Sequence, residues 1–114
     1  MFSYSFTTQD STITKKAIAS QGLASFYANK FNGRKTSSGQ IFSNTELTAA
    51  HKHLKFGTKV MVRNLKNDST VIVIINDRLP PKSKRTIDLT TKAAKQLNFI
   101  KSGLAKVEIT ILES

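Results

Sequence analysis

The apolar residues of this chain fall into short segments that suit β-strands and leave room for only one helix. Val71–Ile75 is an unbroken run of five β-branched residues, which is typical of a strand buried on both faces. Val60 and Val62 alternate with their neighbours over residues 59–63, as in a half-buried strand. The turn-forming residues 66–69 between the two segments predict a β-hairpin.

Four other segments complete a mainly β pattern. Residues 21–28, 47–51 and 87–89 predict short strands, and residues 104–112 predict a final strand with Val107, Ile109 and Ile111 facing inward. Residues 91–98 predict the one helix, N-capped by Thr90 or Thr91, with Ala93, Ala94 and Leu97 on its inner side. About six strands and one helix in 114 residues fit a small β-barrel better than a sandwich or an α/β sheet.

Length and composition indicate one domain without covalent staples. A chain of 114 residues is the size of a single domain, and it contains no cysteine for disulfides or thiolate chemistry. We expect residues 1–20, rich in serine and threonine, to form a tail or lead-in segment and residues 21–114 to form the barrel domain. The longest apolar run is far shorter than the ~20 residues of a transmembrane helix. No secretory signal pattern is visible at the N-terminus, so the chain either stays inside the cell or is a mature region.

The net charge of +11 favours polyanionic partners. Nucleic acids, anionic membrane surfaces and acidic wall polymers all have this property. The basic residues are spread along the chain in short clusters, and no nucleic-acid motif accompanies them. The sequence therefore does not favour nucleic acid as the ligand.

Few carboxylates remain as candidates for chemistry once those with plain structural explanations are removed. Asp77 follows the buried segment 71–75, where burial raises a carboxyl pKa unless a partner compensates; a salt bridge to Arg78 or a turn is the structural alternative. Asp88 precedes the helix, so a role in organising the backbone is its alternative. Glu46 is expected to be a solvated loop residue.

The two histidines, His51 and His53, are two residues apart and would share one face of a strand. No third metal ligand is signalled nearby, and no phosphate-binding or dinucleotide motif is present, so neither a metal nor a cofactor is expected. Asp77, Asp88 and His51 form the candidate polar group. Carboxylates in the groove of a barrel suit glycosidic cleavage best.

Four segments resemble the rare-lipoprotein-A family, in its order and spacing, over about residues 21–112. They are GLASFYANKFNGRKTSSG (22–39), LTAAHKHLKFGTKVMVRNL (47–65), VIVIINDRLP (71–80) and RTIDLTTKAAKQL (85–97). The resemblance implies a six-stranded double-psi β-barrel with one or two short helices, related to expansins and to lytic murein transglycosylases.

The same resemblance implies an activity and a set of site residues. The expected enzyme is a lytic transglycosylase that cleaves the β-1,4 bond between N-acetylmuramic acid and N-acetylglucosamine in peptide-poor glycan strands, leaving 1,6-anhydro ends. The family pattern assigns catalysis to Asp77 as acid and base with His51 as its partner, and expansins point to Asp88 instead. The groove would be lined by Tyr27, Arg34, Thr36, Ser38, Gln40 and Arg78.

Two departures from the family pattern keep a second function open. Gln40 stands where the family usually has glutamate, and an amide cannot transfer a proton at neutral pH. Leu79 stands at a glycine position, which would reshape the loop if that glycine needed positive φ. The alternative is therefore a non-catalytic, expansin-like module that binds cell-wall glycan. In either case the resemblance implies a monomer exported to the periplasm or cell envelope, with any lipid anchor on a segment missing from this chain.

Overall fold

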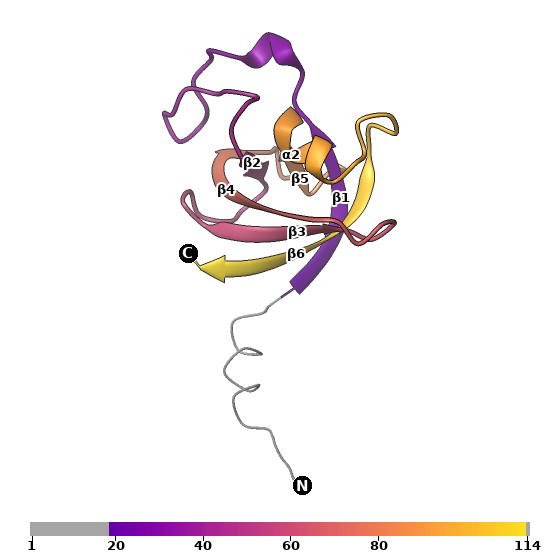
Figure 1. Cartoon of the computed structure of the whole chain (residues 1–114). Coiled ribbons are helices and arrows are strands. Elements are labelled where there is room, and N and C mark those ends of the chain that lie inside the picture. The colour runs from indigo at the N-terminus through magenta and orange to yellow at the C-terminus, as the bar shows by residue number, and fades with distance from the viewer. Residues whose placement is uncertain (1–18, 114) are drawn as a thin grey trace, which may run out of the picture.

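Six strands close into a barrel in the computed structural model, which describes residues 19–113 (Figure 1). The strands around the barrel are, in order, β1 (Ala19–Phe26), β5 (Ile87–Leu89), β2 (Thr48–His51), β4 (Thr70–Arg78), β3 (Lys59–Asn64) and β6 (Ala105–Glu113). β1 runs parallel to β5 and β2 runs parallel to β4, whereas the other neighbours are antiparallel. The predicted six-stranded barrel is confirmed. The expected N-terminal segment lies outside the described residues, except that β1 already begins at Ala19.

The described residues also form two short helical elements. The α-helix, α2 (Thr91–Gln96), covers one end of the barrel, and the 3-10 turn, η2 (Asn29–Phe31), lies in the loop after β1 (Figure 1). Across residues 19–113 there is no helix with the length and apolar character needed to span a bilayer.

The core is made of inward-facing aliphatic side chains from the strands and the inner face of α2. Val60 and Val62 are fully buried, as their alternation predicts, and so are Ala93, Ala94 and Leu97 of the helix end. Thr90 is the helix N-cap: its hydroxyl accepts a hydrogen bond from Ala93 N and donates one to Glu46 O at 2.5 Å. The cap therefore connects α2 to the segment that leads into β2.

β4 differs from the prediction of burial on both faces. Val71, Val73 and Ile75 are buried, but Ile72 is 48% exposed and Ile74 is only half-buried. The physical reason is that a single-layered barrel has one interior, so the outer face of a strand is covered only where a helix or loop crosses it. Burial therefore alternates along β4, although every residue of the run is apolar.

Two buried threonines give opposite predictions for stability. Thr58 Oγ1 is buried without a hydrogen-bond partner, whereas Thr90 Oγ1 has two. We expect Thr58→Val to leave the free energy of unfolding unchanged or to raise it, because it removes an unsatisfied polar atom at nearly constant shape. Thr90→Val should lower it by about 1–2 kcal/mol, because the cap is lost. Urea unfolding of both variants measures the difference, and a larger loss for Thr58→Val would contradict this account.

Candidate active site

Asp77 and Asp88 lie in one row of residues that crosses four strands. Ala50 on β2 pairs with Asp77 on β4 and with Asp88 on β5, and Asp88 in turn pairs with Ser25 on β1. Paired residues of neighbouring strands project from the same face of a sheet. Two strand spacings of about 4.8 Å separate the backbones of the two aspartates by roughly 10 Å. Ala50 is small and buried between them. The structure therefore brings together two of the three predicted site residues.

The Asp77 carboxylate accepts three hydrogen bonds. Tyr27 Oη donates to Oδ2 at 2.6 Å, and the backbone N–H groups of Ser37 and Arg78 donate to Oδ1 at 2.8 and 2.9 Å. Burial alone would raise the pKa of Asp77, but these hydrogen bonds outweigh burial and hold the pKa below its ordinary value. Burial and the bond to Asp77 raise the pKa of the Tyr27 phenol, so it stays a donor. Asp77 is thus held as an ionised carboxylate.

Asp88 lies in the opposite kind of environment. It is 8% exposed, and its one side-chain partner is Ser25, whose hydroxyl donates to Oδ1 at 2.7 Å. Arg85 reaches only the serine, with Nη1 3.2 Å from its oxygen. Burial raises the pKa of Asp88, and the nearby charge of Asp77 adds to this, while Ser25 and Arg85 offset only part of the effect. The row therefore contains two carboxyl groups whose pKa values are displaced in opposite directions.

Arg78 does not form the salt bridge with Asp77 that was the structural alternative for that residue. Its guanidinium donates from Nη1 to the carbonyl oxygens of His51 and Leu54, at 3.0 and 2.7 Å, and stacks on the Phe56 ring. Only its backbone N–H contacts the carboxylate. Arg78 therefore fixes the chain that follows β2, and the salt-bridge alternative for Asp77 is wrong.

His51 lies in the next row, beside Arg78 on β4 and Ile87 on β5. Successive residues of a strand point to opposite faces, so its imidazole projects away from the side that carries Asp77 and Asp88. Nδ1 accepts the backbone N–H groups of His53 and Leu54, both at 3.2 Å. Burial, with the charges of His53, Arg78 and Lys52, lowers the pKa of His51 to about 4. At neutral pH it is an uncharged ring that organises a turn.

The loop between β1 and β2 covers the row and contains most of the predicted groove residues. The Tyr27 ring packs on Phe42 at 4.3 Å between centroids. Ser38 N donates to Asn76 O, next to Asp77, and the hydroxyls of Thr36 and Ser38 are 2.8 Å apart. Arg34 lies over the Phe31 ring, 5.2 Å from its centroid.

Gln40 is an exposed residue that is hydrogen-bonded beside the row. Its Oε1 accepts a hydrogen bond of 3.0 Å from Asn76 Nδ2, one residue before Asp77. It shares a small hollow of about 300 Å³ with Asn76 and Glu46. The amide therefore lies within the same surface as the two carboxyl groups.

Leu79, the second departure, causes no backbone strain. Positive φ among the non-glycine residues of the described chain occurs at Asp68 and Asn98, so Leu79 does not need a glycine. Its side chain is buried, and its N–H donates to His51 O at 3.2 Å.

Sequence reasoning missed three groups that set the environment of the aspartates. Ser25 is 63 residues from Asp88 along the chain and reaches it through the parallel pairing of β1 with β5, and Arg85, close to Asp88 in sequence, contacts that serine. The Ser37 donor is a backbone N–H, which carries no side-chain signal at all. The Ser25 contact follows from the strand register, and the Ser37 contact follows from the path of the loop between β1 and β2.

Solved structures with low sequence identity share this fold. A Clavibacter michiganensis expansin matches with a TM-score of 0.67 at 17% identity, over 85% of this chain and 52% of that chain. A Streptomyces papain inhibitor matches with a TM-score of 0.69 at 17% identity, over 84% of this chain and 96% of that chain. These matches identify the barrel architecture.

Relatives of known name are much closer in sequence. An endolytic peptidoglycan transglycosylase RlpA from Pasteurella multocida is 48% identical over 95 residues, and its Haemophilus influenzae counterpart is 46% identical over 97. These alignments cover 83% and 85% of this chain but 32% and 34% of the relatives, so the chain spans about a third of their length. The family described as lytic transglycolase matches residues 19–109. With its closed six-stranded barrel, the chain belongs to the lytic transglycolase family, of the RlpA-like, double-psi β-barrel type.

Proposed function

We propose that this chain cleaves peptidoglycan glycan strands as a lytic transglycosylase. The bond broken is the β-1,4 link between N-acetylmuramic acid and N-acetylglucosamine in peptide-poor strands, and the product has a 1,6-anhydro end. One observation carries the proposal: Asp77 and Asp88 share a row, and their pKa values are displaced in opposite directions. Two carboxyl groups with separated pKa values are what combined base and acid catalysis requires.

The two aspartates divide the proton transfers. Asp77, held ionised by three donors, takes the proton of the muramic acid C6 hydroxyl as O6 bonds to C1. The C1–O4 bond breaks, and Asp88 gives its proton to the leaving O4. Substrate that excludes water raises the pKa of buried Asp88 further and so favours its acid form. Water then returns one proton to Asp88 and removes one from Asp77, so protons balance over the cycle.

This division refines the expectation from the sequence, where Asp77 alone served both steps. A carboxyl group whose pKa is held low is ionised and free to accept a proton, but it is a weak base and cannot serve as the acid. The buried Asp88 has the complementary property. His51 then acts as a positioning residue, because its imidazole organises the turn whose carbonyl groups hold Arg78.

Substrate contacts fall to the loop that covers the row. Thr36, Ser38 and Gln40 offer hydroxyl and amide groups beside Asp77, as expected for residues that bind sugar hydroxyls. Arg34 extends this surface with positive charge. The protein is proposed to work as a monomer in the cell envelope, where its substrate is found.

A second function, a glycan-binding module without cleavage, is favoured by the contacts of Gln40. Its side chain is hydrogen-bonded to Asn76 and cannot supply the extra proton-transferring group that a glutamate would bring. Under this alternative the groove binds strands, and no 1,6-anhydro ends are released.

The first prediction for catalysis concerns the two aspartates. Asp77→Asn and Asp88→Asn should each lower the cleavage rate by about 10²–10⁴-fold, because each removes a proton-transfer group at constant shape. Peptide-free glycan strands are the substrate, and mass spectrometry of the released ends gives the rate. Binding of the strands should survive in both variants.

Asp68→Asn is the matched control, since this carboxylate lies in the exposed β3–β4 turn and pairs with Arg63. Its cleavage rate should equal that of the wild type. Full activity in Asp77→Asn would reject the role of that residue. A wild type that binds strands without releasing 1,6-anhydro ends would establish the binding module instead.

Gln40→Glu tests whether the groove retains capacity for more acid–base chemistry. A carboxylate at this position would lie beside Asn76 and next to Asp77. We expect a several-fold rise in the cleavage rate on peptide-free strands, measured from the release of 1,6-anhydro ends. Gln40→Ala should not reproduce the gain, and equal rates for both variants would show that position 40 only binds.

His51 predicts a pH dependence of stability. The unfolded chain protonates this ring near its ordinary pKa of about 6.5, whereas the folded protein protonates it only near about 4. The unfolded state therefore binds more protons between these values, and stability falls as pH drops from about 6.5 to about 4. His51→Asn keeps an acceptor for the two N–H groups but does not titrate, so urea unfolding should show a smaller loss. His53→Asn is the control, and an identical loss in both variants would contradict the assignment.

A further inference from the structure

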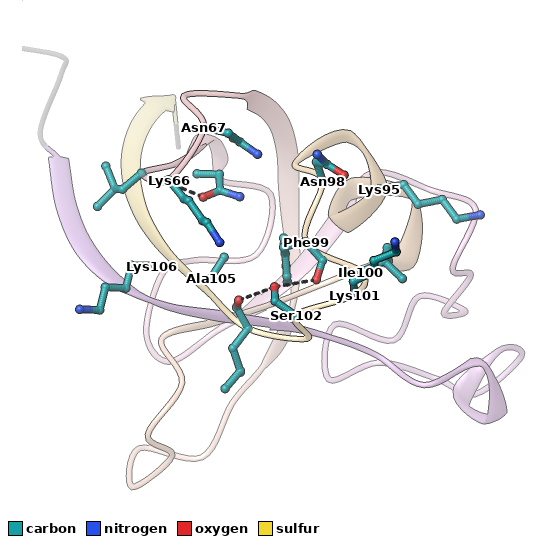
Figure 2. Close-up of a pocket in the computed structure, with 13 residues that line it drawn as sticks. Lys66, Asn67, Lys95, Asn98, Phe99, Ile100, Lys101, Ser102, Ala105 and Lys106 are labelled. Atoms are coloured by element: carbon teal, nitrogen blue, oxygen red, sulfur yellow. Dashed lines mark hydrogen bonds between the residues drawn. The ribbon is translucent and has the colours of Figure 1, made fainter.

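A large basic hollow lies away from the two aspartates. It has a volume of about 1090 Å³ and is formed by the β3–β4 turn, the end of α2 and the loop before β6. Its lining includes four lysines, which Figure 2 labels, and two exposed aliphatic side chains: Lys66, Lys95, Lys101, Lys106, Ile100 and Leu104. Lys66 and Lys106 lie on one side of Phe99, and Lys95 and Lys101 lie on the other.

The positive charge of this hollow is not neutralised by the protein. Among residues 19–113, no carboxylate lines it. The nearest candidates on the same turn and strand, Asp68 and Glu108, are both paired with Arg63, at 2.6 and 3.2 Å. Within the part of the chain that the structure describes, the four lysines form no ion pair. Four like charges around one concave surface attract an anion and repel one another until it binds.

Hydrogen bonds connect the backbone segments that form the hollow. Asn64, Asn67 and Ser69 all donate to the carbonyl oxygen of Leu97, at 2.8, 3.2 and 3.2 Å. These bonds join the β3–β4 turn to the end of α2. Ser102 Oγ closes the loop before β6 through Phe99 O and Leu104 O (Figure 2). The backbone segments that carry the lysines are therefore held in place before a ligand binds.

The aliphatic edge distinguishes between kinds of anion. Ile100 is 37% exposed and Leu104 is 49% exposed, and both belong to the loop that carries Lys101. An acidic glycan or a nucleic acid backbone offers little apolar surface to such side chains. A bilayer of anionic phospholipid offers phosphate groups to lysines and an apolar layer below them to isoleucine and leucine.

We propose that this face of the barrel docks on the surface of an anionic phospholipid bilayer, with Lys66, Lys95, Lys101 and Lys106 on the headgroup phosphates and Ile100 and Leu104 inserted between them. The interaction is reversible and electrostatic, and it weakens as salt screens the charges. Docking does not require cleavage activity. It would place the proposed enzyme at a membrane surface.

The position of this face determines how the aspartate row is oriented when the barrel is docked. β4 begins beside the hollow, and Asp77 lies seven residues after Thr70, or about 23 Å along the strand. In Figure 1 the β3–β4 turn and the loop before β6 lie on one side of the barrel, and the end of β4 lies on the other. A barrel docked through the hollow therefore presents the aspartate row away from the bilayer.

Co-sedimentation of the full chain with vesicles tests the proposal. Two sets of vesicles are the probes. The first contains roughly 30% phosphatidylglycerol in phosphatidylcholine, which gives a negative surface potential, and the second contains phosphatidylcholine alone. We expect binding to the first set only. Lys66→Gln/Lys101→Gln should weaken it by roughly tenfold to thirtyfold, from the typical contribution of each lysine at an anionic surface. Ile100→Ser/Leu104→Ser should weaken it several-fold.

Lys82→Gln/Lys84→Gln is the matched control, because it removes the same charge from exposed positions in the loop after β4. It should weaken binding by less than about threefold through net charge alone. Equal losses in the two lysine pairs would overturn the proposal, as would wild-type binding to DNA or polyglutamate without binding to the vesicles. Glycan cleavage by Lys66→Gln/Lys101→Gln should match the wild type, so vesicle binding and the proposed activity are tested separately.

Discussion

The placement of β2 between β4 and β5 is the constraint on which the candidate site depends. β2 is parallel to one neighbour and antiparallel to the other, and Ala50 is paired on both sides. This register aligns Asp77 with Asp88 although 11 residues separate them along the chain. The pairing of β2 with β4 skips Asn76 between Ala49 and Ala50, and this bulge places Asp77 opposite Ala50. A slip that removed the bulge would pair Asp77 with His51, on the face where Ile87 belongs to the core. Closure of the barrel removes the free edges that would permit such a slip.

The carboxyl groups of Asp77 and Asp88 are chemically identical, but their surroundings in the barrel displace their pKa values in opposite directions. Asp77, at the end of β4, meets backbone donors from the covering loop and the phenol of Tyr27. Asp88, in the middle of the short β5, is buried with one hydroxyl donor. Hydrogen bonds to a carboxylate favour its ionised form, and loss of water favours its neutral form. The two roles in the proposed reaction follow from this difference in local environment.

The sequence predicted much of the fold because the signals involved are local. Two such signals are the alternation of apolar and polar residues over residues 59–63 and 104–112 and the capping residue Thr90. Each depends only on neighbouring residues, and the structure agrees with both. The exposure of Ile72 could not be predicted, because a run of β-branched residues does not reveal whether a second layer covers the strand. Asp77 and Asp88 were found by eliminating other carboxylates. The contact of Ser25 with Asp88, and the orientation of His51, depend on pairing between distant strands.

The central claim is that the two aspartates of the row have separated pKa values, and their carboxyl groups can be followed directly. Carbon-13 carboxyl chemical shifts of labelled protein, recorded against pH and assigned with Asp77→Asn and Asp88→Asn, give each pKa. We predict a value below about 3.9, the ordinary aspartate pKa, for Asp77 and a value above it for Asp88. Coincident values near about 3.9, or the reverse order, would contradict the division of base and acid between the two residues.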